Sequence, residues 1–376
     1  MRMLVQGNQA VFLGAVKAGA TFFAGYPISP SSEILVLAAE HAARNSVFKL
    51  IQSEDEIGAV NAIMGASLAG AKSFTATSGP GFSLMQEAVG YGHQVEIPTV
   101  IVDVQRVGPA TGMPTMPAQQ DLLQAMHGSS GDYYPLVFYP NSVEECYRYT
   151  ILAFNAAEES LSPVILLSDA FLGHLIETVD LEAIPVLYPP GIVWHEHNLD
   201  LDLVVPGGMA PLEIVSRQRP PLGTGQRAFT GLTHDWRGQQ RTADAGVYRE
   251  WLAGVKKRHQ EIAGNYRFYE YIDHPTSDTL LIAFGIVSRV VRPLASRFAI
   301  FRPISMAPLL ADELREYGRR FKNVVVVEAN DGQYAQLVEW ALRREVRRVP
   351  LLGGRMNIPL IEAELGRMGI GEGLSV

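Results

Sequence analysis

The 376-residue sequence contains a single cysteine, Cys146. One thiol cannot form an intrachain disulfide, and it cannot by itself hold an iron–sulfur cluster or a structural zinc ion. Basic residues are also scarce, 31 against 39 acidic ones, and the net charge of −8 argues against a protein that binds nucleic acid phosphates. No apolar run approaches the ~20 residues of a membrane helix, and the first residues lack the apolar core of a signal peptide. We therefore expect a cytoplasmic protein without a membrane or nucleic-acid partner.

Several common site motifs are missing as well. The chain has no G-x-G-x-x-G after a strand, no G-x-x-x-x-G-K-[ST] and no G-x-S-x-G. His195-Glu196-His197 lacks the i, i+4 spacing of a zinc helix. The sequence therefore predicts no metal ligands.

Short apolar runs alternate with helical patterns through the first 167 residues. Val100–Val104, for example, is apolar except for Asp103, as is typical of a strand buried on both faces. The pattern predicts an α/β unit with a parallel sheet covered on both faces. The expected strands are 21–25, 47–52, 72–77, 98–105, 135–139 and 164–167, and the expected helices are 8–19, 31–44, 56–70, 82–93, 119–126 and 142–160.

The composition changes after about residue 180. Residues 181–270 are rich in Pro and Gly turns and contain a charged helical stretch at 247–263, and we expect Trp194, Trp236 and Trp251 to be buried. A second α/β unit begins near Thr279, with strands at 280–284 and 323–327 and helices at 288–298, 312–321 and 333–344. The organisation that we expect is 1–180, 181–270 and 271–376.

Three acids open the helix that starts near residue 56. Ser53-x-x-Glu56 has the spacing of a capping box, and acids favour a helix N-terminus. The pattern alone therefore favours a structural role. Small residues on the same helix indicate close packing against a sheet or another subunit.

Two further segments lie where α/β sheets bind ligands, at the carboxyl ends of strands. Two prolines stiffen Gly25–Glu33, either as a ligand loop or as a helix entry. Arg106 follows the 98–105 strand and is suited to grip a carboxylate, or else forms an ion pair with Asp103 or Glu87. Gly79-Pro80-Gly81 is a tight strand-to-helix turn that is also suited to face a phosphate.

Several segments together resemble the α subunits of 2-oxoacid:ferredoxin oxidoreductases, most of all the 2-oxoglutarate type. They are Gly25–Ile34, Glu54–Gly81, Val102–Leu122, Phe229–Asp235, and Arg302–Pro308 with Val327–Gln333. Tyr26–Ser32 resembles the family's Y-P-I-T-P-S loop, with serine for threonine at Ser29. Thr75–Met85 and Val104–Gly112 are very close to family sequences, and Thr230–Asp235 is similar to a connector typical of 2-oxoglutarate-type chains. The matching segments occur in the family's order over most of the chain.

The resemblance implies a fold and a function. It implies a pyrimidine-type thiamine diphosphate-binding domain over 1–180, a connecting region over 181–270 and a transketolase C-terminal-like α/β domain over 271–376. It implies oxidative decarboxylation of a 2-oxoacid, 2-oxoglutarate to succinyl-CoA, with coenzyme A and ferredoxin. The alternatives are a branched-chain 2-oxoacid or pyruvate enzyme subunit, or a non-catalytic scaffold that keeps the fold.

The resemblance also implies partners. Thiamine diphosphate is shared with a β subunit, whose G-D-G…N motif holds the diphosphate and Mg²⁺ and which carries an iron–sulfur cluster. Further γ- and δ-type subunits are expected. This chain has no G-D-G, since Gly131-Asp132-Tyr133 does not fit, so it should supply only the pyrimidine side.

The same resemblance implies roles for individual residues. Glu56 matches the family glutamate that activates the cofactor, because the small residues after it keep the family spacing; Glu54 would need a two-residue shift and is the alternative. Ser29 and Arg106 would bind the substrate. The other cofactor-binding residues would be Tyr26, Pro27, Ile28, Ser78 and Gly79.

Overall fold

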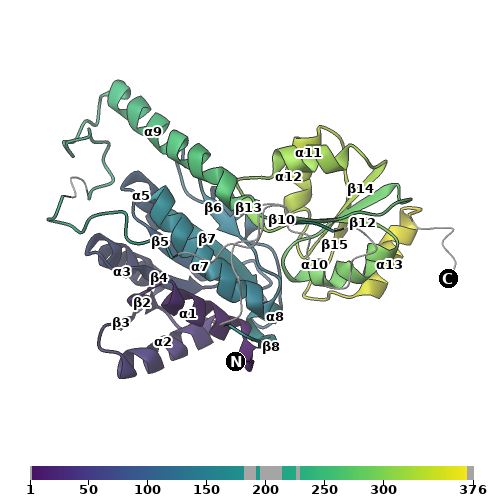
Figure 1. Cartoon of the computed structure of the whole chain (residues 1–376), viewed down its shortest axis with the longest axis horizontal. Coiled ribbons are helices and arrows are strands. Elements are labelled where there is room, and N and C mark those ends of the chain that lie inside the picture. Colours follow the sequence, from purple (N-terminus) through teal and green to yellow (C-terminus); the bar gives the residue numbers. More distant parts are fainter. Residues whose placement is uncertain (1, 182–191, 195–213, 226–228, 371–376) are drawn as a thin grey trace.

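The computed structural model describes residues 2–181, 192–194, 214–225 and 229–370. Two α/β units lie side by side, each built on its own sheet (Figure 1). The first sheet has seven strands in the order β13-β6-β7-β5-β4-β2-β3, and every pairing is parallel except that of β13 with β6. Its strands are β2 (Phe22–Gly25), β3 (Lys49–Gln52), β4 (Ser73–Thr77), β5 (Thr99–Gln105), β6 (Leu136–Phe138), β7 (Pro163–Asp169) and β13 (Ser305–Ala307).

The central strands β4, β5 and β7 are buried at every residue. Such strands have helices on both faces, which explains why they read as apolar runs without alternation. The expected strands of this unit are confirmed to within two residues at each end. The helices are α1 (Gly7–Lys17), α2 (Ser32–Arg44), α3 (Glu56–Leu68), α4 (Gly79–Leu84), α5 (Gln86–Gln94), α6 (Leu122–His127), α7 (Val143–Ser160) and α8 (Ala170–His174).

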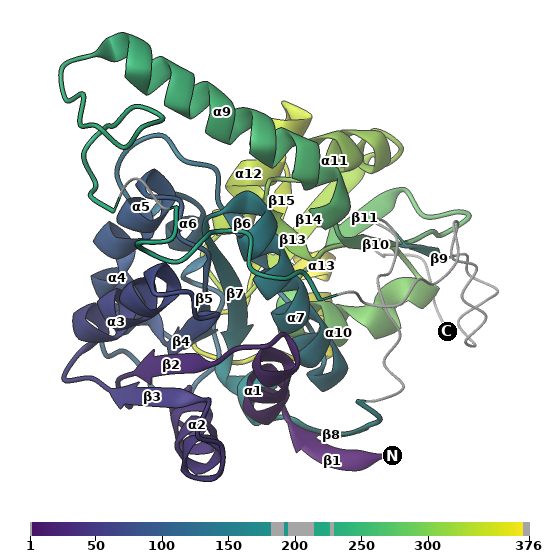
Figure 2. The same ribbon diagram turned by 60° about the vertical axis from the view of Figure 1, so that its left-hand side comes forward.

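Two elements of the first unit differ from expectation. The helix expected over 82–93 is two helices: α4 ends at Leu84 and α5 begins at Gln86, with Met85 as the cap between them. The expected pattern also lacked an antiparallel ribbon of β1 (Met3–Gln6) and β8 (Ile176–Val179), which lie side by side next to α1 in Figure 2.

The second sheet has six strands in the order β15-β14-β11-β12-β10-β9, parallel except for β10 with β12. Its strands are β9 (Ile192–Trp194), β10 (Tyr269–Ile272), β11 (Thr279–Ile282), β12 (Ala299–Pro303), β14 (Asn323–Glu328) and β15 (Arg347–Pro350). Its helices are α10 (Gly285–Val291), α11 (Ala311–Gly318), α12 (Gln333–Leu342) and α13 (Ile358–Arg367). The helix expected over 288–298 is α10 followed by a 3₁₀ turn at Arg292–Ser296, where Pro293 has no N–H to continue the α-helix.

One apolar core extends through both units. It joins residues of α3, α5 and α6 to one face of the second sheet, including Tyr139, Phe284 and Tyr334. Separate cores lie under α1, α2 and α7 and under α10 and α13. The continuous core shows that the two units pack as one body.

Chain crossings also tie the units together. After β12 the chain returns to the first sheet as β13, where Ser305 pairs with Phe138 of β6. The long helix α9 (Ala245–Ala263) packs on α7 and extends past the first unit (Figure 1). The expected burial of Trp236 is wrong: its side chain is 70% exposed, because the connector around it runs along the surface. Trp251 is half-buried, and the side chain of Trp194 lies outside the described part of the structure.

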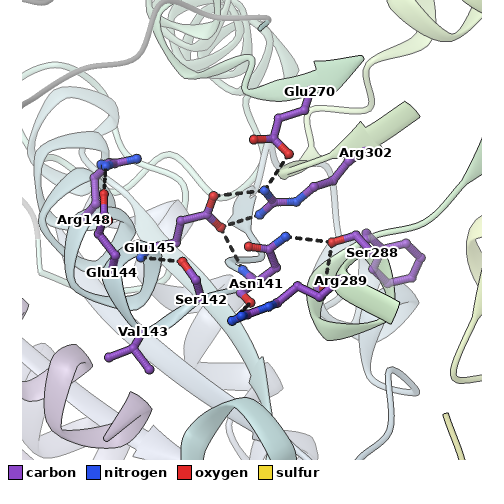
Figure 3. A network of polar contacts seen from close by, with 12 residues as sticks. Asn141, Ser142, Val143, Glu144, Glu145, Arg148, Glu270, Ser288, Arg289 and Arg302 are labelled. Carbon is purple, nitrogen blue, oxygen red and sulfur yellow. Dashed lines mark hydrogen bonds and ion pairs between the residues drawn. The ribbon is translucent and has the colours of Figure 1, made fainter. Parts of the chain in front are cut away.

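A buried ionic network joins the units (Figure 3). Arg302 of β12 donates to Glu270 of β10 and, in bidentate fashion, to Glu145 of α7. Beside it, Asn141 donates its side-chain amide to the Ser288 hydroxyl at 2.9 Å. Burial raises the pKa of Glu145, but Arg302, the Asn141 N–H and Arg148 together outweigh burial, and the net direction is down.

No helix in the described ranges is long and apolar enough to cross a membrane. His195-Glu196-His197 lies outside the described residues. Within them, no group of three His, Cys, Asp or Glu side chains is placed to hold a metal ion.

Candidate active site

The residues singled out in the sequence meet at one edge of the first sheet. Tyr26–Ser29 follow β2, Ser78–Gly81 follow β4, and Arg106 follows β5. Glu56 begins the helix after β3. Because parallel strands end at the same edge, these segments come together there. The four segments surround a site that no one of them could form alone.

Helix α3 is capped by Asp55, not by Ser53. The Asp55 carboxylate accepts a hydrogen bond from the Gly58 N–H at 2.7 Å. The capping box considered for Ser53 and Glu56 is therefore wrong. Asp55 does the capping, which leaves the Glu56 side chain available for another role.

Glu56 is 5% exposed, whereas Glu54 is exposed. Burial raises the pKa of Glu56. Its own backbone N–H opposes this rise, the charge of Asp55 adds to it, and Arg106 lowers it. These surroundings favour retention of a proton on Glu56.

Gly81 provides the space that the Glu56 carboxyl occupies. A Cβ atom at position 81 would lie 2.3 Å from Glu56 Oε1 and 2.3 Å from Thr77 Oγ1. The Gly79-Pro80-Gly81 turn thus forms the surface on which the carboxyl rests. Only glycine at position 81 permits this close approach.

Arg106 contacts Ser29 and forms no ion pair with any residue that the structure describes. Its Nη1 donates to the Ser29 carbonyl oxygen at 2.7 Å, and the side chain is 6% exposed. The alternative ion pair with Asp103 or Glu87 is therefore not present. The structure brings Ser29 and Arg106 together, as the substrate assignment requires.

Buried polar atoms without partners gather at this edge. Within the described part of the chain they include Thr77 Oγ1, Ser78 Oγ and Arg106 Nε, together with both Asp103 carboxyl oxygens and Asp121 Oδ2. Buried polar groups are almost always hydrogen-bonded, so such a cluster indicates a place for a ligand or water.

Asp103 and Asp121 are site residues that the sequence reasoning missed as a pair. Asp103 is completely buried on β5, and its carboxyl group lies within hydrogen-bonding reach of Asp121. Burial raises the pKa of both groups, that of Asp121 to about 6. The signal was present, because Asp103 interrupts an otherwise apolar strand.

A cleft of about 530 Å³ opens beside these residues. Gly79, Arg106 and Asp121 line it from the first unit, and Asn330 and Gln333 line it from the second. The Asn330 side-chain amide donates to the Gln119 carbonyl oxygen at 2.7 Å, and this hydrogen bond joins the two units beside the cleft. The second unit therefore contributes one wall of the site.

The whole chain is also similar to known proteins. Residues 13–238 match the family "Pyruvate flavodoxin/ferredoxin oxidoreductase, thiamine diP-bdg". The chain is 38% identical to the 2-oxoglutarate synthase subunit KorA of Methanothermobacter marburgensis, over 94% of this chain and 96% of that protein. It is 32% identical to the ketoisovalerate oxidoreductase subunit VorB of the same organism, with 94% of each covered.

A solved structure is also similar. It is the 2-oxoglutarate:ferredoxin oxidoreductase of Magnetococcus marinus, with 2-oxoglutarate, coenzyme A and succinyl-CoA bound, at a TM-score of 0.82 and 29% identity. The match covers 98% of this chain and 65% of that one. These matches confirm the thiamine diphosphate-binding fold that the sequence motifs implied. This chain therefore belongs to the α-type subunits of the 2-oxoacid:ferredoxin oxidoreductases, within the 2-oxoglutarate group.

Proposed function

We propose that this chain is the α subunit of a thiamine diphosphate-dependent 2-oxoglutarate:ferredoxin oxidoreductase. The enzyme would convert 2-oxoglutarate and coenzyme A to succinyl-CoA and CO₂ and pass two electrons to ferredoxin. Identity to 2-oxoglutarate synthase subunits is 37–38%, against 32% to ketoisovalerate subunits. The observation that carries the proposal is the buried Glu56 at the same sheet edge as Arg106. Coenzyme A and ferredoxin as co-substrates favour a cytoplasmic complex.

The proposed role of Glu56 is to hold a proton at the cofactor's pyrimidine ring. When bound, thiamine diphosphate supplies the nucleophilic carbon that adds to the 2-oxo group. Glu56 would hydrogen-bond a ring nitrogen, and its raised pKa favours sharing a proton with that nitrogen. Burial keeps water from competing for this bond.

The residues at the site fit the pyrimidine end of the cofactor. Ser78 Oγ is buried without a partner in the described chain, and Gly79 lies beside it at the cleft. Together with Tyr26, Pro27 and Ile28 they would hold the ring.

The diphosphate, Mg²⁺ and iron–sulfur clusters would be held by other subunits. The chain has no G-D-G motif and only one cysteine, and Cys146 is buried. We propose a β subunit for the diphosphate and Mg²⁺, with an iron–sulfur cluster, and further γ- and δ-type subunits. Within this chain we propose 1–180 as the pyrimidine-binding domain, 181–270 as the connector and 271–376 as the transketolase C-terminal-like domain.

Arg106 and Ser29 would bind the substrate's 2-oxocarboxylate. The Arg106 fork donates one bond to the Ser29 carbonyl oxygen, and its Nε lacks a partner among the described residues. A guanidinium with unused donors is suited to bidentate contact with a carboxylate. The exposed Ser29 hydroxyl would add a hydrogen bond to the same group.

The substrate is tested with the complete complex. Ferredoxin reduction is measured with 2-oxoglutarate, pyruvate and a branched-chain 2-oxoacid, each with coenzyme A. We expect the highest kcat/KM for 2-oxoglutarate. A preference for the branched-chain acid would transfer the assignment to the ketoisovalerate type, and inactivity with every acid would favour a scaffold subunit.

The catalytic acid is tested by Glu56→Gln, with Glu54→Gln as the matched control. Gln keeps the shape of the side chain but cannot exchange a proton. We expect Glu56→Gln to lower kcat by about 10²–10⁴ without unfolding the chain. The exposed Glu54→Gln should leave kcat close to normal; the reverse pattern would assign the role to Glu54.

A further inference from the structure

The acid pair beneath the turn has no role in the chemistry described so far. Asp103 comes from the middle of β5 and Asp121 from the N-terminal end of α6. The Asp121 N–H donates to the Gln105 side-chain oxygen at 3.0 Å, which ties the start of α6 to β5. This bond holds Asp121 near β5, where its carboxyl group interacts with that of Asp103.

Two interacting carboxylates, one of them completely buried, cannot both be ionised without strong repulsion. Neither Asp103 oxygen has a hydrogen-bond partner by ordinary geometry within the described chain, and Asp121 Oδ2 is also unmatched. A single proton between them would satisfy both groups. Burial raises the pKa of Asp103 well above its ordinary value, and the charge of nearby Asp121 raises it further. Asp103 is completely buried whereas Asp121 is partly exposed, so the proton is placed on Asp103 and the negative charge on Asp121.

The pair lies next to the Gly79 turn and interacts with Arg106. The Gly79 N–H lowers the pKa of Asp103, and a Cβ on Gly79 would lie 3.5 Å from Asp121 Oδ2. Asp121 also interacts electrostatically with Arg106. The remaining titratable neighbour is Tyr139, whose hydroxyl donates to Asp169 at 3.1 Å.

We propose that Asp103 and Asp121 share one proton and act as positioning residues, which fix the Gly79 turn and the guanidinium of Arg106. The turn carries Gly81, on which Glu56 rests, so the pair supports both the cofactor side and the substrate side of the site. With Asp103 protonated, the pair carries a single negative charge, on Asp121. That charge is shared between the Asp103 O–H and the Arg106 guanidinium. The kinetic consequences of this proposal rest on the proposed function. The existence of the shared proton is independent of that function.

The shared proton is measured on the full chain without substrate. The chain is labelled with ¹³C at the Asp carboxyl carbons, and the carboxyl signals are followed by NMR from pH 5 to 9. We expect one signal, missing in Asp103→Asn, to remain that of a protonated acid at neutral pH. If every Asp signal is that of a carboxylate at pH 6, the shared proton does not exist and the proposal fails, whatever the enzyme's activity.

The positioning role is measured on the assembled complex with two variants of Asp103. Asp103→Leu removes the donor, so the Asp121 charge should draw Arg106 away from the substrate and raise the KM for the 2-oxoacid by roughly 10–150-fold, the value of a hydrogen bond to a charged group. Asp103→Asn retains an N–H donor toward Asp121 and should recover most of that loss. Equal KM increases in both variants, or a loss in kcat alone, would overturn the positioning role.

Discussion

Substitution of Gly81 by Ala should move the proposed catalytic acid without touching it chemically. The new methyl carbon would lie 2.3 Å from Glu56 Oε1, whereas ordinary contacts are 3.4 Å or longer. The Glu56 carboxyl must therefore shift by about 1 Å, and a displacement of that size costs about 10²-fold in rate. Gly81 is not among the residues with positive φ, so alanine adds no backbone strain. Overpacking should lower the free energy of unfolding by about 1–3 kcal/mol.

The assay is kcat of the assembled complex with 2-oxoglutarate, coenzyme A and ferredoxin, together with denaturant unfolding of the chain. Gly254→Ala in α9 is the matched control, since no atom lies within 4 Å of its added methyl. It should leave kcat unchanged and stabilise the helix by about 0.5–1 kcal/mol. A Gly81→Ala complex with normal kcat would refute the reasoning, because it would show that the position of Glu56 does not matter.

Three further outcomes are expected. Arg106→Lys should raise the KM for the 2-oxoacid by about 10–150-fold with ferredoxin affinity unchanged, whereas a normal KM with a lowered Tm would indicate a structural role. Arg302→Met should cost about 3–5 kcal/mol of unfolding free energy because it leaves Glu145 buried and unpaired; the exposed Arg320→Met should cost less than about 1 kcal/mol, and equal costs would contradict the argument. Burial raises the pKa of Glu328 to about 7, so its stabilising contribution is complete below about pH 4.5 and is lost as the pH rises through 7. Between pH 5 and pH 8, the free energy of unfolding of the wild type should therefore fall by up to about 3 kcal/mol relative to that of Glu328→Gln. The same difference between the two proteins at both pH values would refute this reasoning.

The sequence by itself determined most of the strands and helices of the first unit. Strands buried on both faces must be apolar at nearly every position, so 98–105 and 164–167 were recognisable as strands without any tertiary contact. The motifs at Tyr26–Ser32 and Thr75–Met85 identified the family, because they combine fixed backbone with specific side chains. Strand order then placed these motifs at a common edge.

Only the tertiary structure decided what each polar side chain does there. Ser53 and Asp55 both suit a helix N-terminus, and the path of the chain after β3 selects Asp55. Arg106 lies near acids in the sequence, yet folding directs it to the Ser29 carbonyl, 77 positions away along the chain.

The sequence also cannot predict the role of a polar group that depends on a partner far away in the chain. Asp103 and Asp121 are 18 positions apart. No periodic pattern in the sequence links a residue within a strand to the first residue of the helix that follows a long loop. The pairing of β13 with the first sheet was not predicted for a similar reason. A strand of three residues is too short for its sequence to indicate which strand it pairs with. Local sequence fixes the conformation of the backbone through sterics and burial, whereas the partners of buried polar groups depend on distances that exist only after the sheets have packed.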